Sequence, residues 1–251
     1  MQNKLVDVVQ GIPIVSSHGF LGWSSVSIME DREGYVLFDT GGYNNKGALI
    51  NALRNLKIDF KQVRKVLVTH LHFDHCMNVD LFPNATLYVG KREIDYALSE
   101  EPDKVGDIFV PKPYIREILR RHDVVEVKDG DKLGNNVKVV ELPGHTPGCV
   151  GYLINESIIF TGDALRNTHE LIYKIPSLCF GGEDAWRRSI EKITSIAKVI
   201  IPGHERRLII EDSEVKYLTE GKEIAFKFVI KGKMKEFSLN PDKGLVKFLF
   251  G

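Results

Sequence analysis

The chain of 251 residues contains few cysteines and no excess of charge of either sign. Its three cysteines, Cys76, Cys149 and Cys179, are odd in number and widely spaced, which excludes a disulfide framework and a paired-cysteine metal knuckle. Lys plus Arg and Asp plus Glu each number 34, so no overall basic field attracts nucleic acid or an anionic membrane. These absences predict a cytoplasmic protein that has no nucleic-acid partner.

Long hydrophobic runs are absent as well. No stretch approaches the roughly 18 apolar residues that are needed to cross a bilayer. Residues 1–15 have no charged leader followed by a long apolar core, so we expect no signal peptide and no membrane partner. What remains, 43% hydrophobic and 27% charged residues, is typical of a soluble globular protein with enough chain for a buried core.

Short apolar segments alternate with segments of helical periodicity along most of the chain, which predicts two packed sheets with helices outside them. The segment 99–113 is expected to be a long loop or lid. Helices are expected near 48–56, 90–98, 114–121 and 183–197. Strands are expected near 12–16, 24–30, 34–39, 65–69, 86–89, 123–127, 137–142, 149–154, 158–161 and 198–202.

The tail after residue 205 has a different pattern. Two segments that alternate apolar and polar residues flank Lys231-Gly232-Lys233, which predicts a β-hairpin, and a further strand is expected at 245–250. Such a hairpin could pair with a second copy, so a homodimer is one expectation.

A dense group of ionisable residues follows the predicted strand at 65–69. Residues 70–75 read His-Leu-His-Phe-Asp-His, with three histidines and one aspartate in six positions. Imidazole and carboxylate groups suit zinc, iron or manganese. Four such side chains buried together would carry a large desolvation cost without a metal. The group therefore predicts a metal site that distant residues complete.

Three distant residues fit this role because each stands beside a glycine at the end of an apolar strand. His145 lies in LPGHTPG, Asp163 in FTGDA and His204 in IPGHE. Strand ends of this kind gather at one edge of a sheet and allow close backbone approach. The predicted metal ligands are therefore His70, His72, Asp74, His75, His145, Asp163 and His204.

With these motifs in order, the sequence resembles the metallo-β-lactamase superfamily over about residues 20–205. The matching segments are FDTGG with Asp39, THLHFDH at 69–75, PGHTPG at 143–148, TGDA at 161–164 and PGHE at 202–205. The resemblance implies an α+β fold, an αββα sandwich of two mixed β-sheets flanked by helices, with the site along one rim. It also implies a first metal on His70, His72 and His145, a second on Asp74, His75 and His204, and Asp163 bridging both.

The resemblance further implies a metallo-hydrolase with a dinuclear metal centre. Two divalent metal ions, zinc first and iron or manganese as alternatives, would share a hydroxide that cleaves an ester, thioester or lactone of a small molecule. Asp74 is the candidate catalytic residue, orienting the nucleophile and carrying a proton. Arg166, His169 and Tyr173 are the predicted substrate-binding residues. Homoserine-lactone lactonases usually carry a tyrosine where Arg166 stands, so this chain departs from them there.

Several alternatives stay open on the same fold. A mononuclear iron persulfide dioxygenase would use His70, His145 and Asp163. A small-molecule phosphodiesterase is a second alternative, and a non-catalytic metal-binding or partner-binding protein is a third. For the domains, we predict a metallo-β-lactamase-like catalytic domain over 1–205 and, over 206–251, a C-terminal β-hairpin extension packed on the same domain.

Overall fold

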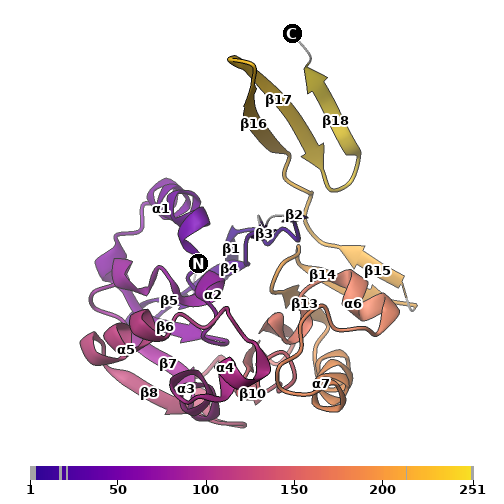
Figure 1. Cartoon of the computed structure of the whole chain (residues 1–251). Coiled ribbons are helices and arrows are strands. Elements are labelled where there is room, and N and C mark those ends of the chain that lie inside the picture. The colour runs from indigo at the N-terminus through magenta and orange to yellow at the C-terminus, as the bar shows by residue number, and fades with distance from the viewer. Residues whose placement is uncertain (1–3, 17–18, 21, 213, 250–251) are drawn as a thin grey trace.

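The computed structural model describes residues 4–16, 19–20, 22–212 and 214–249, and it shows the predicted sandwich of two mixed sheets between helices (Figure 1). The strands of the first sheet lie in the order β1 (Leu5–Val9), β4 (Val26–Asp31), β5 (Gly34–Phe38), β6 (Val63–Val68), β7 (Thr86–Gly90) and β8 (Val124–Val127). Strand β4 is antiparallel to both of its neighbours, β1 and β5, and the strands from β5 to β8 run parallel to one another.

The strands of the second sheet lie in the order β15 (Glu214–Tyr217), β14 (Leu208–Glu211), β13 (Val199–Pro202), β12 (Ile158–Gly162), β11 (Val150–Ile154), β10 (Val137–Glu141) and β9 (Lys132–Leu133). All neighbouring pairs are antiparallel except β12 and β13, which are parallel. Separately from both sheets, β2 (Val15–Ser16) and β3 (Gly19–Phe20) form a short hairpin before β4.

Helices cover the outer face of each sheet. The first sheet packs against α1 (Lys46–Asn55), α3 (Lys91–Leu98) and α5 (Lys112–Arg121), and the second against α7 (Glu183–Ile196). Three shorter helices lie near the rim: α2 (Phe73–Cys76), α4 (Glu101–Val105) and α6 (Thr168–Tyr173). None of the helices in the described residues has the length and hydropathy of a membrane span.

Strand alternation divides the apolar residues among three buried layers. Along β5, Leu37 packs with the residues under α1, whereas Phe38 faces the space between the sheets. Along β12, Phe160 packs against Phe38 with ring centroids 5.7 Å apart, and Ile159 turns outwards towards α7. Each fully buried side chain of this size stabilises the fold by about 1.5–3 kcal/mol. Packing of these layers fixes the position of one sheet against the other, so that strand ends of both sheets lie along one rim.

The loop regions differ from the sequence prediction in places. The predicted strand at 12–16 is reduced to β2 and one bridge between Ile12 and Trp23. The predicted loop at 99–113 contains α4 and the start of α5. Helix α4 begins with Pro102 in its first turn and ends at Gly106, whose φ of 73° favours glycine. It is too short to show a helical period, so periodicity could not reveal it.

The tail also differs from the predicted arrangement. Strands β14 and β15 continue the second sheet to Tyr217, beyond the predicted boundary at 205. The rest forms a three-stranded sheet of β16 (Ile224–Ile230), β17 (Lys233–Asn240) and β18 (Gly244–Leu249), and residue 250 of the predicted last strand lies outside the described residues. Figure 1 shows this sheet projecting from the sandwich instead of lying against it.

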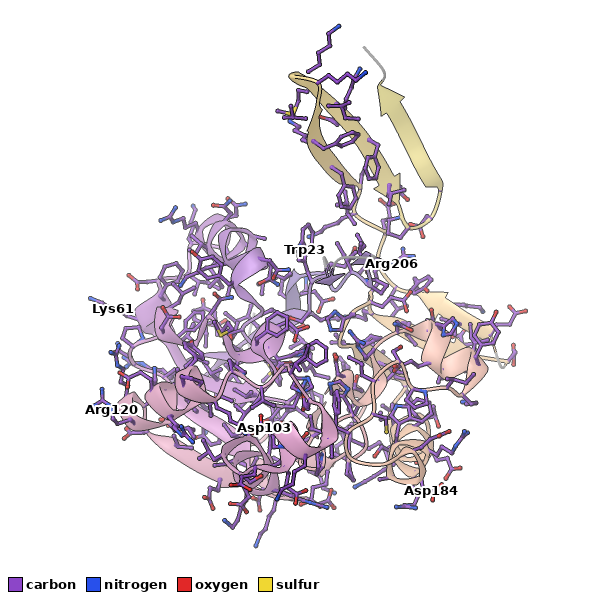
Figure 2. The ribbon with its side chains drawn as sticks, viewed as in Figure 1. Trp23, Lys61, Asp103, Arg120, Asp184 and Arg206 are labelled. Atoms are coloured by element: carbon purple, nitrogen blue, oxygen red, sulfur yellow. The ribbon has the colours of Figure 1, made fainter. Side chains whose placement is uncertain are left out.

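The side chain of Arg206 helps to join the projecting sheet to the sandwich. Arg206 is buried, and its guanidinium donates to both carboxylate oxygens of Asp242, at 2.9 and 2.6 Å. Its guanidinium carbon lies 3.9 Å from the ring centroid of Tyr217 in β15. Figure 2 shows Arg206 at the base of the projecting sheet. This contact lies at the base of the projecting sheet. Within that sheet, the rings of Phe226 and Phe237 stack with their centroids 4.7 Å apart.

Candidate metal centre

Strand ends of both sheets deliver the predicted ligands to one rim. His70 follows β6, Asp163 follows β12, and His204 follows β13. The loop between β10 and β11 carries His145, and helix α2 carries the second half of the cluster. Because the helical turn of α2 folds back on the strand end, side chains close in sequence converge instead of alternating outwards.

The first group consists of His70, His72 and His145, all buried. Nδ1 of His72 lies 3.0 Å from Nε2 of His145. The ring of His70 lies 4.7 Å from that of His72 and 4.8 Å from that of His145, centroid to centroid. One nitrogen from each ring falls within 4.8 Å of the others, a spacing at which three imidazoles can hold one metal ion.

The second group consists of Asp74, His75 and His204. Nε2 of His204 lies 3.2 Å from Oδ2 of Asp74, and Nε2 of His75 lies 3.8 Å from the same oxygen. The two histidines are buried, whereas the Asp74 side chain keeps 16% of its surface exposed. Asp74 is thus the ligand candidate that reaches both the second group and the solvent side of the site.

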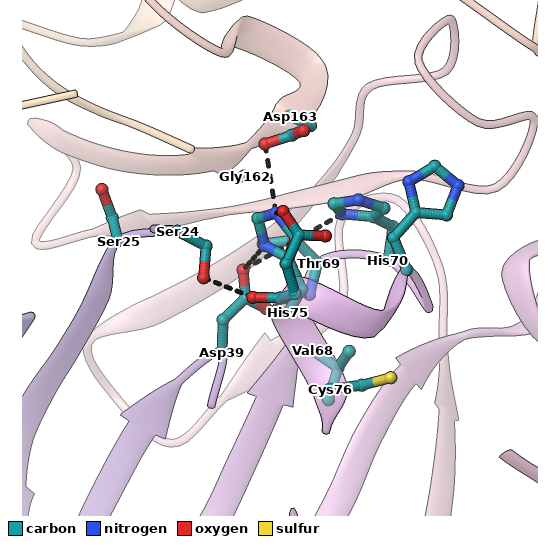
Figure 3. Close-up of polar contacts among 12 residues, drawn as sticks. Ser24, Ser25, Asp39, Val68, Thr69, His70, His75, Cys76, Gly162 and Asp163 are labelled. Atoms are coloured by element: carbon teal, nitrogen blue, oxygen red, sulfur yellow. Dashed lines mark hydrogen bonds and ion pairs between the residues drawn. The ribbon is translucent and has the colours of Figure 1, made fainter. Parts of the chain in front are cut away.

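Asp163 lies between the two groups. Its Oδ1 is 3.1 Å from Nε2 of His75 and 3.2 Å from Nε2 of His204. Its Oδ2 is 3.5 Å from Nε2 of His145 and 2.9 Å from Nε of Arg166. One carboxylate oxygen therefore faces the second group and the other faces the first, which is the placement a bridging ligand requires. Figure 3 shows Asp163 above His75.

Unsatisfied polar atoms test whether a metal fits here. Four polar atoms of the centre are buried without a hydrogen-bond partner among the described residues: Nε2 of His70, His75 and His204, and Oδ1 of Asp163. Buried polar atoms are otherwise almost always paired. Imidazole nitrogens and a carboxylate oxygen that converge without partners match the ligand set of a borderline divalent cation. The residues present therefore fit a metal centre.

The charge environment separates the two groups. Burial lowers the pKa of His145 to about 3, and burial followed by repulsion from His75 holds the pKa of His70 well below its usual value. For His75, burial acts in the same direction, but Asp163 and the other neighbouring carboxylates outweigh it and raise its pKa well above the usual range. His70 and His145 are thus neutral and ready to donate lone pairs, whereas His75 is charge-paired with the neighbouring carboxylates.

Asp39, at the end of β5, contacts the histidine cluster through Thr69 and His75. Its carboxylate accepts hydrogen bonds from the Thr69 backbone N–H at 2.7 Å and the Thr69 hydroxyl at 2.8 Å, and Oδ2 lies 2.7 Å from Nδ1 of His75 (Figure 3). The contact fixes Nδ1 of His75 as the outer nitrogen and turns Nε2 towards the centre. Asp39 is fully buried with a φ of 54°, a strained conformation of the kind found at functional sites.

Sequence reasoning missed two buried acids that support the centre. Asp107 lies beyond α4, and its Oδ2 is 2.9 Å from Nε2 of His72 and accepts a hydrogen bond from the Tyr96 hydroxyl at 2.8 Å. Glu93 in α3 accepts from the Leu71 N–H at 2.9 Å and the Thr146 hydroxyl at 2.7 Å, which ties the two histidine loops together. Neither acid lies in a motif, so only its burial in the fold identifies it.

Replacing Asp107 with asparagine should weaken metal binding at the first group. The carboxylate accepts from His72 and orients its other nitrogen, and outer partners of this kind typically change metal affinity or activity by about 10–100-fold. We expect a loss of that size in metal affinity, measured by competition with a chromogenic chelator. Asp103→Asn, in the exposed part of α4 (Figure 2), is the matched control and should bind metal like the wild type. Unchanged affinity in Asp107→Asn would contradict the orienting role.

The three predicted substrate contacts fall in different places. Arg166 lines a cavity that opens over the centre, with an empty volume of about 720 Å³. His169 and Tyr173 lie on α6 with ring centroids 4.6 Å apart, and Tyr173 is 62% exposed. Neither of these two belongs to the lining. The cavity is lined by Pro13, Ile14, Gly22, Asn44, His72, Phe73, Asp74, Phe109, Asp163, Arg166, Asn167, Ser177, Leu178 and His204.

Known proteins share this fold. The metallo-beta-lactamase superfamily profile matches residues 21–204, and the chain belongs to this superfamily. A Methanocaldococcus jannaschii protein named "Probable metallo-hydrolase" is 26% identical over 170 residues, which is 68% of this chain and 70% of that protein. An N-acyl homoserine lactonase of Bacillus thuringiensis is 24% identical over 210 residues, or 71% of this chain and 79% of its own length. The solved structure of AidC, a dizinc quorum-quenching lactonase, has the same fold, with a TM-score of 0.62, 18% identity, and coverage of 79% and 80%.

Proposed function

We propose that this chain is a metal-dependent hydrolase that holds two divalent ions, zinc before iron or manganese, and cleaves an ester, thioester or lactone of a small molecule. The observation that carries the proposal is the position of Asp163, whose two oxygens face two separate groups of ligand candidates. The metallo-hydrolase and lactonase names of the relatives support the reaction class. The seven ligand assignments are part of the proposal.

Two divalent ions at this site would lower the pKa of a shared water and polarise a substrate carbonyl. The chain's own residues would orient that chemistry. Burial raises the pKa of Asp74, but attraction to His75 and His204 outweighs it and keeps the carboxyl ionised at neutral pH. Its partly exposed carboxylate, at the cavity wall, is placed to accept a proton from the nucleophile and return it to the leaving group.

The cavity is suited to a small molecule with an apolar portion. Its lining combines apolar side chains with the few polar groups of the centre, which is typical of small-molecule sites. Phe73, Phe109 and Leu178 supply apolar wall, and Phe109 also packs on the His72 ring at 5.5 Å between centroids. This wall would exclude water from one side of the centre and hold the acyl portion of the substrate.

The proposal is tested by comparing metal-loaded and chelated protein on a panel of lactones, thioesters and esters. We expect hydrolysis by the loaded protein, its loss after dialysis against a chelator, and its return when zinc is added. Hydrolysis that survives complete metal removal would contradict the proposal. Oxygen uptake with glutathione persulfide, together with one iron per chain, would replace the hydrolase by the dioxygenase alternative.

A further inference from the structure

The backbone of Arg166 is held by hydrogen bonds, whereas its guanidinium makes none to a described residue. The backbone N–H donates to Glu170 at 2.8 Å, and the backbone carbonyl accepts from the N–H of His204 at 2.7 Å. The side chain is only 11% exposed and lies in the cavity lining. Nε lies 2.9 Å from Asp163 without hydrogen-bond geometry, and the guanidinium makes no hydrogen bond to any described residue. The guanidinium is thus held at the cavity in an ion pair with Asp163, and no hydrogen bond to a described residue occupies its donors.

The neighbouring acids do not neutralise this guanidinium. Glu170 is occupied by the backbone N–H groups of Arg166 and Ser177, and Glu205 by the N–H of Thr168 and the hydroxyl of Tyr217. Among the described residues, Asp163 alone forms an ion pair with the guanidinium. An arginine that is mostly buried needs an anionic partner, because it does not lose its proton.

Metal binding would remove that single counter-charge. Asp163 would then be shared between the two divalent ions, which leaves Arg166 without a counter-charge of its own. Arg166 therefore favours a ligand that brings a negative charge to the cavity, which a neutral ester or lactone does not carry.

We propose that Arg166 forms an anion subsite, so that the substrate carries a second oxyanion, a carboxylate or a phosphate, a short apolar stem away from the group that is cleaved. The planar guanidinium can donate two parallel hydrogen bonds to either oxyanion. Phe73, Phe109 and Leu178 of the same cavity supply the surface for the stem. The inference rests on the proposed hydrolase, because that function defines the cleaved group, but binding at Arg166 can be measured without turnover.

Calorimetric titration of the metal-loaded protein with two simple acids tests the subsite. Butyrate has one carboxylate for the metal centre, whereas glutarate has a second that can reach Arg166, and 3-phosphonopropionate tests a phosphonate in its place. We expect at least one of the two dianions, glutarate and 3-phosphonopropionate, to bind at least about tenfold more tightly than butyrate. Whichever dianion shows this preference identifies the oxyanion. In Arg166→Met the preference should disappear, and in Arg166→Lys part of it should return.

Two controls keep the outcome interpretable. Arg188→Met removes an exposed arginine on α7 and should leave the preference unchanged. Metal content is measured in every variant, so that loss of a metal ion is not mistaken for loss of the subsite. A wild-type protein that binds all three acids equally, or an Arg166→Met variant that keeps the full preference, would overturn the inference. Absence of hydrolysis alongside an intact preference would instead count against the proposed hydrolase and leave the subsite standing.

Discussion

Asp163→Asn should reduce the metal content from about two ions per chain to one or none and lower the hydrolysis rate by at least about 10²-fold. The asparagine keeps the size of the side chain but removes the negative charge that faces both ligand groups. Loss of one preorganised charge at a reacting centre typically costs this much. Metal per chain by elemental analysis and the turnover rate of the most active panel substrate are the measurements.

The control for this variant is Asp184→Asn, the same chemical change in the exposed first turn of α7 (Figure 2). It should keep both the metal content and the rate. The far-ultraviolet circular dichroism of Asp163→Asn should match that of the wild type, because the two sheets and their apolar layers do not depend on this carboxylate. If Asp163→Asn binds two ions and keeps its rate, the bridging role is wrong.

Asp74→Asn is expected to have the second large effect, on turnover more than on binding. An asparagine can still offer an oxygen to the second group, but it cannot accept a proton at neutral pH. General acid–base catalysis typically contributes about 10²–10⁴-fold, so we expect kcat to fall by about 10²-fold or more while KM changes little. Steady-state kinetics on protein that is fully loaded with metal gives both values.

A nearby carboxylate provides the comparison for Asp74. Asp80 lies six residues further along the chain on the surface, where it pairs with Lys46 at 3.3 Å. Asp80→Asn should therefore keep the wild-type kcat. Full activity of Asp74→Asn with full metal content would show that another group carries the proton. An equal loss of metal and of activity would assign Asp74 a ligand role only.

Much of the centre could be predicted from the sequence because its ligands follow apolar strands and stand beside glycines. The strand before His70 and the strand before His204 are both short apolar runs, so their ends could be located from the pattern. Asp107 and Glu93 could not be predicted in the same way. Their roles depend on where α3 and the segment after α4 fold relative to the histidine loops, and no local pattern records that distance.

The fold also has strands that could be predicted from the sequence and strands that could not. Residues 66–68 of β6 and most of β12 are buried and read as continuous apolar runs, so the two strands were predicted to within about two residues of their ends. Strands β14 and β15 have mostly exposed or half-buried residues, and they pair at the edge of the second sheet. Their place depends on hydrogen bonding to β13, which the hydrophobic pattern does not show. The projecting sheet was predicted as strands, but it was expected to pack on the catalytic domain, whereas Figure 1 shows it projecting from the sandwich.

The most direct test of the dinuclear centre is the metal content of wild-type protein purified without added metal, with zinc, iron and manganese each quantified per chain. The account predicts about two ions per chain in total, held by the seven proposed ligands. A protein that retains no metal and binds none when zinc is supplied, or that never takes up more than one ion per chain, would contradict it.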